Sequence, residues 1–253
     1  MIQRTIVIGD PQGCATELEQ LLEKCRATLD DRVIIAGDLI DRGPESGRCI
    51  DIAMRLERRQ GTSSAILGNH EEKHLHYKDL ETWGRDPKVV IPTHVETRKQ
   101  LTEEHYAWMR KLKLFIRLPE HDAAVVHAGA YPGRPLEAQD PHHLLHIQMI
   151  DPPNEKSMWP SRAPEGWKFW AHFWDGPERL IFGHSVLDRP LLTDRVCGID
   201  GGACFGMELR AVILPGWEIV SVKGQHDHGK GSRGRGREKI KTIPVHGDVC
   251  TFS

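Results

Sequence analysis

Residues 37–43 read GDLIDRG, and this stretch decides the fold class because it directly follows a short apolar run at 32–36. A helical pattern begins at about Glu45, so the segment joins a strand to a helix. The same order of strand, polar turn and helix occurs around 5–25, where Leu18, Leu21 and Leu22 recur at helical spacing, and again around 64–78. Successive units of this kind predict an α/β fold whose first strands are parallel.

The second half of the chain is predicted to be mostly strands. A helix is expected first, at 102–112, with Thr102 as its N-cap. Segment 79–101 shows no apolar period and is expected to form a loop or a small cap region over the site, and the Pro- and His-rich segment 128–163 is expected to be irregular. The later apolar or alternating runs predict strands at 114–118, 123–127, 179–182, 195–199, 208–214 and 218–222. A Pro-Gly turn joins the last two, which predicts an antiparallel end to the sheet.

Length and composition indicate one catalytic domain, at 1–223, followed by a basic, Gly- and Arg-rich C-terminal tail at 224–253. The tail has too little apolar content to bury a core. Its run GSRGRGREK could bind RNA, but a solvated terminus is the favoured interpretation. The net charge of −2 excludes a global attraction to nucleic acid or to an anionic membrane.

Two features indicate the cellular compartment. The six cysteines include no CxxC pair, which favours reduced thiols over a disulfide scaffold or a zinc ribbon. The first residues lack a signal-peptide pattern, and no apolar run reaches about 18 residues. We therefore expect a cytoplasmic protein with no membrane-spanning segment.

Five short motifs stand at the ends of predicted strands: GDPQG at 9–13, GDLIDRG at 37–43, GNHE at 68–71, HAG at 127–129 and GHS at 183–185. The carboxyl ends of strands in an open α/β sheet converge on one crevice, so side chains distant in sequence can meet there. Carboxylates, amides and imidazoles without thiolates suit manganese, iron or zinc. The motifs offer six such side chains: Asp10, Gln12, Asp38, Asn69, His127 and His184.

The charges of this set indicate a phosphate substrate. Two divalent ions bring four positive charges against the two carboxylates of Asp10 and Asp38, and the surplus attracts an anion. Two adjacent ions can activate water and clamp the attacking and leaving oxygens of a displacement. His70 is the candidate general acid, with Asp41 positioned to orient it. The fork of the Arg42 guanidinium suits two phosphate oxygens.

Taken in order, GDxxG, GDxxDRG, GNHE, HAG and GHS resemble the motifs of the phosphoprotein-phosphatase branch of the calcineurin-like metallophosphoesterases, over roughly residues 5–222. The resemblance implies a two-sheet αββα sandwich with two divalent metal ions at its edge, and hydrolysis of phosphate esters or anhydrides by hydroxide formed at the ions. Manganese is the first choice, with iron, zinc, nickel or cobalt as alternatives. The implied ligands are Asp10, Gln12 and Asp38 for the first ion, and Asp38, Asn69, His127 and His184 for the second.

Some residues depart from the family pattern or extend it. Gln12 stands where the family usually has histidine, and a neutral oxygen donor should hold the first ion more loosely. The block GIDGGACFGMEL near 198–209 resembles a late landmark of the family but differs from it at Gly201 and Met207. Because the family often places a phosphate-contacting arginine before the GH motif, Arg162 is a second candidate for contacting the substrate.

The motifs HAG and GNHE, together with RGPES at 42–46, resemble those of bacterial bis(5'-nucleosyl)-tetraphosphatases of the symmetrical group. Dinucleoside polyphosphates or other small phosphorylated molecules are therefore the first candidate substrates. Members of that group commonly replace the aspartate at the place of Asp41, so a phosphoprotein Ser/Thr phosphatase is the alternative. An RNA-directed phosphatase and an inactive binding module are less favoured.

Other polar and aromatic clusters are expected to be structural. Glu72, His74 and His76 are predicted to lie on a solvated helix face, with Glu71 left open. The histidines at 142, 143 and 146 are expected on a loop surface. The aromatic run at 167–174 is expected to pack in the core or the cap, with stacking on a nucleobase as the alternative for an exposed ring.

Overall fold

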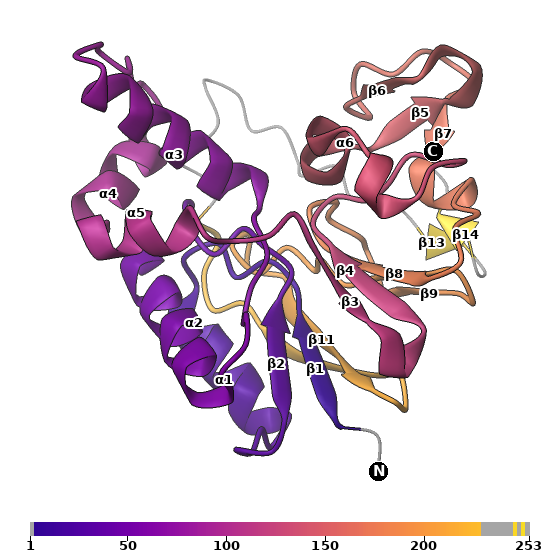
Figure 1. The fold of residues 1–253 in the computed structure, drawn as a ribbon, viewed down its shortest axis with the longest axis horizontal. Coiled ribbons are helices and arrows are strands. Elements are labelled where there is room, and N and C mark those ends of the chain that lie inside the picture. Colours follow the sequence, from indigo (N-terminus) through magenta and orange to yellow (C-terminus); the bar gives the residue numbers. More distant parts are fainter. Residues whose placement is uncertain (1–2, 229–244, 247–248, 251–253) are drawn as a thin grey trace.

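The computed structural model describes residues 3–228, 245–246 and 249–250. Two sheets lie face to face (Figure 1). The first has the order β12-β11-β1-β2, and its strands are β1 (Thr5–Ile8), β2 (Arg32–Ile35), β11 (Glu208–Leu214) and β12 (Glu218–Lys223). The second has the order β3-β4-β8-β10-β9, and its strands are β3 (Phe115–Leu118), β4 (Ala123–Val126), β8 (Arg179–Phe182), β9 (Leu191–Leu192) and β10 (Val196–Gly198).

Strand β1 shows how the sequence builds layers, because its side chains alternate between the two faces of the first sheet. Val7 packs between the sheets with Ile34 of β2 and Val125 of β4. Ile6 and Ile8 belong instead to the cluster beneath the helices. Since β1 is buried on both faces, its sequence TIVI is apolar throughout. The parallel pairing of β1 with β2 and the antiparallel pairing of β11 with β12 confirm the predicted strand directions.

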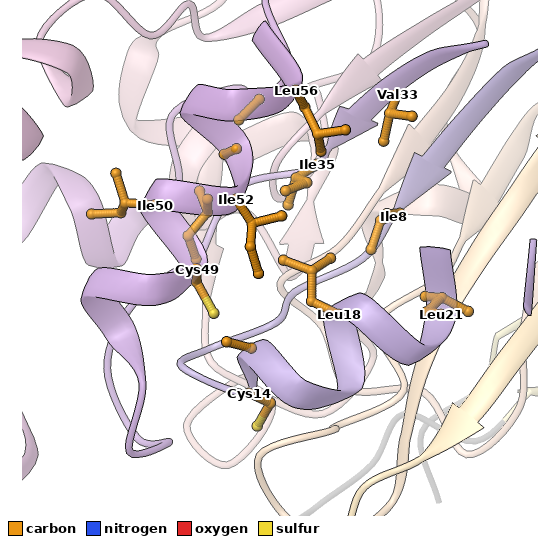
Figure 2. Packing of buried hydrophobic residues seen from close by; sticks show 14 of the residues in the cluster. Ile8, Cys14, Leu18, Leu21, Val33, Ile35, Cys49, Ile50, Ile52 and Leu56 are labelled. Carbon is orange, nitrogen blue, oxygen red and sulfur yellow. The ribbon is translucent and has the colours of Figure 1, made fainter. Parts of the chain in front are cut away.

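Helices α1 (Ala15–Lys24) and α2 (Ser46–Gln60) cover the outer face of the first sheet. Figure 2 shows Leu18 and Leu21 of α1 gathered with Ile52 of α2 over Ile8 and Ile35. Each fully buried leucine of this kind contributes about 1.5–3 kcal/mol through removal of apolar surface from water. Helix α5 (Glu103–Met109) extends the same layer. The Thr102 hydroxyl accepts the backbone N–H of His105 at 3.2 Å, which confirms the predicted N-cap.

The expectation of a loop at 79–101 is wrong for much of the segment. Helix α3 (Asn69–Thr82) continues past the predicted end, and α4 (Pro92–Gln100) follows it. Proline at the first turn of α4 favours helix initiation. The buried residues of α4 are His94 and Thr97, which are polar. An apolar period therefore could not reveal this helix.

The expectation of an irregular segment at 128–163 is also wrong. Helix α6 (Pro141–His146) and a small sheet of order β6-β5-β7 lie beyond the second sheet (Figure 1). The small sheet is formed by β5 (Met149–Asp151), β6 (Lys156–Met158) and β7 (Lys168–Phe169). Beneath these elements, buried Phe169 and Trp170 pack against Phe182 of β8. The outer face of the second sheet is thus covered, which completes the sandwich, and the expected core packing of these two aromatic residues is confirmed.

Short elements complete the described chain. The predicted strand at 64–67 forms only isolated bridges, from Ala65 to Ile35 and from Ile66 to Lys113. Four single-turn helices occur, at η1 (Pro119–His121), η2 (Leu136–Ala138), η3 (Pro152–Asn154) and η4 (Trp170–His172). Within the described ranges, no helix has the length and apolar character needed to cross a membrane.

Hydrogen bonds to the two-sheet body continue slightly beyond the predicted boundary at 223. The backbone N–H of Gln225 donates to Glu17, and the backbone N–H of His228 donates to the carbonyl of Cys204. Strands β13 (Val245–His246) and β14 (Val249–Cys250) pair with each other inside the predicted tail. The Arg-Gly run at 231–239 lies outside the described residues.

Candidate active site

The polar residues of all five motifs meet beyond the carboxyl ends of β1, β2, β4 and β8, as strand-end convergence predicts. Backbone hydrogen bonds tie the loops together. The N–H of Gln12 donates to the carbonyl of Asp38 at 2.8 Å, and the N–H of Gly183 donates to the carbonyl of His127 at 2.9 Å. The backbone N–H of His70 donates to Asp38 Oδ1 at 3.0 Å. Segments distant in sequence are therefore fixed relative to one another.

Four of the predicted metal ligands converge on one point. His127 Nε2 lies 3.3 Å from Asp38 Oδ1 and 2.9 Å from Asn69 Oδ1. His184 Nδ1 lies 2.9 Å from the same Asn69 oxygen. Ligand atoms of Asp38, His127 and His184 all lie within 4.8 Å of one another. This clustering of oxygen and imidazole nitrogen is the geometry that the second predicted ion requires.

The protonation states of the two imidazoles also suit a cation. His127 Nδ1 lies 2.8 Å from the carbonyl oxygen of Ala36, which can only accept, so Nδ1 carries the proton and the Nε2 lone pair faces Asn69. Burial lowers the pKa of His127 and, more strongly, that of His184, where neighbouring His127 adds to the effect. Neutral imidazole is the metal-binding form. A cation shared by His127 Nε2 and Asn69 Oδ1 would satisfy both lone pairs.

Asp10 and Gln12 stand beside this cluster, where the first ion is predicted. Asp10 Oδ2 accepts the backbone N–H of His184 at 2.8 Å, whereas buried Oδ1 has no hydrogen-bond partner among the described residues. Burial, with the nearby carboxylates of Asp200 and Asp38, raises the pKa of Asp10 well above its usual value. A cation at this position would relieve the mutual repulsion of the three carboxylates.

Gln12 reaches the site, but its amide oxygen is engaged elsewhere. The Cys204 thiol donates to Gln12 Oε1 at 2.8 Å, and Gln12 Nε2 donates to Asp38 Oδ2 at 3.4 Å. For Gln12 to bind the first ion through oxygen, its amide would have to turn over. Its role as a ligand therefore stays a prediction.

His70 and Asp41 form the predicted pair. His70 Nδ1 lies 2.6 Å from Asp41 Oδ2, and His70 Nε2 faces the metal ligands, 3.9 Å from Asp38 Oδ2. Burial alone would lower the pKa of His70, but the carboxylates of Asp38 and Asp41 raise it above its usual value. A protonated His70 can donate a proton at the Nε2 atom that faces the site.

The two predicted phosphate-binding arginines differ in their settings. The half-buried guanidinium of Arg42 stacks 5.0 Å from the centroid of the Phe205 ring. Among the described residues, its buried Nε has no hydrogen-bond partner. Arg162 is exposed, and its backbone N–H donates to the carbonyl of Trp159. The phosphate roles of both residues stay predictions.

Two histidines lie in settings other than those predicted. His74 is fully buried and lies 2.8 Å from Asp41, so the prediction of a solvated position is wrong. His143 is also buried, against Tyr131, rather than on a loop surface. Glu72 and His76 are exposed, as predicted. A buried polar residue whose partners come from other segments has the same local sequence pattern as a solvated one.

Two further residues of the site carried no clear sequence signal. Buried Glu71 accepts the backbone N–H groups of Asp38 at 2.9 Å and of Gly68 at 3.0 Å, so it supports the loop that carries the central carboxylate. Trp159 is 53% exposed, and its ring centroid lies 5.7 Å from that of His184. An exposed aromatic surface thus adjoins the candidate metal centre.

The fold, the motif order and the ligand geometry together define a metal-dependent phosphoesterase. The chain belongs to the calcineurin-like phosphoesterase family, whose model matches residues 3–203. Members of this family are hydrolases that use a dimetal centre. The family assignment and the sandwich fold predicted from the motifs are therefore confirmed.

Two bacterial relatives indicate which phosphoesterases this chain resembles. The chain is 25% identical over 231 residues to the asymmetrical bis(5'-nucleosyl)-tetraphosphatase PrpE of Oceanobacillus iheyensis, covering 85% of this chain and 90% of that protein. It is 28% identical over 243 residues to the protein of the same name from Geobacillus thermodenitrificans, covering 88% and 95%. These relatives are designated asymmetrical, whereas the sequence motifs pointed to the symmetrical group.

Solved structures agree with this comparison. A crystal structure described as a provisional diadenosine tetraphosphatase matches with a TM-score of 0.74 and 28% identity, covering 88% of this chain and 95% of that chain. A protein serine/threonine phosphatase from Saccharomyces cerevisiae matches with a TM-score of 0.55 and 14% identity, covering 89% and 80%. At that identity the second match shows the shared fold alone.

Proposed function

We propose that this chain is a dimetal phosphohydrolase of dinucleoside polyphosphates that cleaves a dinucleoside tetraphosphate asymmetrically, into a nucleoside monophosphate and a nucleoside triphosphate. One observation carries the proposal: His127 Nε2 and His184 Nδ1 both lie 2.9 Å from Asn69 Oδ1, with Asp38 alongside. The names of the relatives support the substrate class and the asymmetry. The proposed binding partners of the chain are therefore small phosphorylated molecules.

The ligand set supports two divalent ions, with manganese first and iron, zinc, nickel or cobalt as alternatives. When bound, the ions would supply positive charge to the phosphate chain and lower the pKa of a water molecule. The proposed ligands are Asp10, Gln12 and Asp38 at the first position, and Asp38, Asn69, His127 and His184 at the second.

The other residues of the site have roles that do not require them to bind metal. His70 holds a proton at Nε2 for the departing phosphate oxygen, and Asp41 orients the ring through Nδ1. Arg42 offers its guanidinium to two phosphate oxygens, since it stacks on the Phe205 ring and its Nε has no hydrogen-bond partner within the described part of the chain. Arg162 is the second proposed phosphate contact.

The exposed Trp159 ring supports a nucleotide rather than a phosphopeptide substrate. Its ring centroid lies 5.7 Å from that of His184, so a flat apolar surface adjoins the proposed metal ligands. Stacking of a base on an aromatic ring is worth about 1–3 kcal/mol. A nucleobase that follows a bound phosphate could use this surface.

One panel tests the proposal. Metal-stripped protein is reloaded with each candidate ion and offered diadenosine tetraphosphate, p-nitrophenyl phosphate and a phosphoserine peptide. We expect the highest kcat/KM with the dinucleotide and manganese, with AMP and ATP as products, and no turnover of any substrate by Asp38→Asn. Preference for the peptide would favour the Ser/Thr phosphatase alternative. Two molecules of ADP as the product would contradict asymmetric cleavage.

The Trp159→Ala variant tests the nucleobase contact. We expect its KM for diadenosine tetraphosphate to rise roughly 5- to 160-fold, as the loss of one stacking contact implies, and Trp159→Phe to recover most of the loss. Trp83, which is 64% exposed at the far end of α3, provides the control variant Trp83→Ala. Equal KM values for the two alanine variants would exclude a stacking role.

A further inference from the structure

One buried carboxylate, that of Asp41, is surrounded by three imidazoles from two helices. Its Oδ2 lies 2.6 Å from His70 Nδ1 and 3.3 Å from His94 Nε2, and its Oδ1 lies 2.8 Å from His74 Nε2. His70 and His74 lie one turn apart on α3, and His94 comes from α4. Asp41 and His74 are fully buried, and His94 is 4% exposed. We name these four residues the Asp41 network.

The charge of Asp41 determines which nitrogen of each neighbour carries a proton. Burial alone would raise the pKa of Asp41, but hydrogen bonds from His70 and His74 hold the pKa far below its usual value. An ionised carboxylate can only accept hydrogen bonds. His70 must therefore carry hydrogen on Nδ1 and His74 on Nε2. With Nδ1 committed to Asp41, His70 Nε2 is the nitrogen left to face the metal ligands.

His94 closes the network from the opposite side. Its Nδ1 lies 3.3 Å from the hydroxyl of Tyr77, which can donate to it, so Nε2 is left as the protonated nitrogen facing Asp41. Burial lowers the pKa of His94 to about 4, which keeps the ring neutral at physiological pH. His94 therefore places a neutral ring 3.3 Å from the Asp41 carboxylate without adding a second positive charge beside His70.

Helix α4 supports Asp41 at a second point. The backbone N–H of Asp41 donates to the Ser46 hydroxyl at 3.0 Å, and that hydroxyl lies 3.2 Å from the hydroxyl of Thr97. Asp41 itself has a φ of +73°, a conformation that needs outside support in any residue other than glycine. The loop, the carboxylate and the general acid are thus held together by groups that touch neither metal nor substrate.

We propose that His74 and His94 are positioning residues for catalysis: they hold the Asp41 carboxylate and, through it, keep His70 in the tautomer and orientation required of the general acid. The proposal rests on the proposed function, since it presupposes proton donation by His70. Removing His74 leaves Asp41 Oδ1 buried without a partner, which costs free energy unless the carboxylate turns. A turned carboxylate no longer fixes the His70 ring.

Leaving-group dependence is the first test. Loss of a general acid slows substrates with poor leaving groups most, so phenyl phosphate should suffer more than p-nitrophenyl phosphate. For His74→Leu we expect kcat/KM with phenyl phosphate to fall at least about tenfold more than with p-nitrophenyl phosphate, in the direction that His70→Asn shows in full. His74→Gln, whose amide can donate from the same place, should recover most of the loss. His76→Leu, exposed on the same helix, is the matched control.

A second measurement is independent of turnover and of bound metal. The ring ¹⁵N resonances of metal-free protein report the tautomer of each histidine. Wild type should show His70 protonated on Nδ1, and both His74→Leu and His94→Leu should show that population mixed or inverted. Retention of the Nδ1–H tautomer in both variants would overturn the proposal, as would an equal loss of activity on all leaving groups.

The same experiments distinguish the positioning role from a third metal site and from a failure of the proposed function. Three ligand atoms of Asp41, His70 and His94 lie within 4.8 Å of one another, close enough for a third cation. Binding of a third manganese ion per chain, abolished by His94→Leu, would replace the positioning role with a metal site. If the wild type hydrolyses no phosphate ester but the tautomers behave as expected, the proposed function fails while the network itself stands.

Discussion

Replacement of Gly183 by alanine should weaken metal binding, because the chain approaches Asp10 too closely there for any side chain. A Cβ atom at Gly183 would lie 1.8 Å from Asp10 Oδ1, whereas ordinary contact begins at 3.4 Å. The carboxylate would have to retreat by ~1.6 Å, the shortfall between those two distances, if the backbone stayed fixed. Asp10 cannot retreat freely, because it is buried and its Oδ2 accepts the backbone N–H of His184 at 2.8 Å.

The size of the effect follows from the role proposed for Asp10 as a ligand of the first ion. Disturbing a group that positions a metal ligand typically costs 10- to 100-fold in affinity, or about 1.4–2.7 kcal/mol. For Gly183→Ala we expect a loss of about this size at the weaker of the two manganese sites. The stronger site should change less, because the three atoms nearest to the new methyl group all belong to Asp10.

Isothermal titration of manganese into metal-stripped protein measures both dissociation constants. Gly216→Ala is the matched control, because a Cβ at Gly216 meets nothing within 4 Å. The midpoint of thermal unfolding in the absence of metal shows whether either variant is merely misfolded. A folded Gly183→Ala protein that binds two manganese ions with wild-type affinity would refute the placement of Asp10 at the first ion.

Two further predictions concern the body of the protein. Leu18→Ala removes a fully buried side chain and should lower the free energy of unfolding, measured by urea denaturation, by about 2–5 kcal/mol. The control variant Leu29→Ala, at a position that is 75% exposed, should change this free energy by less than about 0.5 kcal/mol. Equal effects of the two variants would contradict the assigned core. Because burial lowers the folded-state pKa of His94 to about 4, below the unfolded value of about 6.5, the contribution of this ring is fully present above pH 6.5 and is lost as the pH falls toward 4. His94→Asn should therefore flatten the dependence of metal-free stability on pH in that window, and an unchanged slope would exclude the assignment.

The convergence of the proposed metal ligands could be predicted from the sequence because their motifs follow two strong local patterns. Short strands end one to three residues before Asp10, Asp38 and His127, and the carboxyl ends of such strands meet at one edge. The motif order then implied which side chains act together. Neither pattern predicts the orientation of the Gln12 amide, because it depends on a hydrogen bond from Cys204, which lies 192 positions away in the sequence.

The Asp41–His70 pair was predicted, but the other two members of the Asp41 network, His74 and His94, were missed for a related physical reason. His74 and His94 are buried by one another and by Asp41, and His74 Nε2 pairs with Asp41 rather than with water. His74 Nδ1 has no hydrogen-bond partner among the described residues. Hydrophobic periodicity identifies only apolar burial. Helix α4, whose buried side chains are polar, and the strands β5 to β7, which have two or three residues each, therefore carry no periodic signal.

Backbone conformation explains why the site requires so much support. Several of its residues have left-handed backbone angles, which cost about 1–2 kcal/mol each outside glycine. They are Gln12, Asp38, Asp41, Arg42 and His184. Glu71 offsets part of this cost at the second motif, because its buried carboxylate accepts the N–H groups that the turn at Asp38 leaves unpaired. The geometry of the site thus rests on buried polar groups outside the proposed ligand set, which is why the Asp41 network offers a sharper test of the proposed mechanism than further substitution of the ligands.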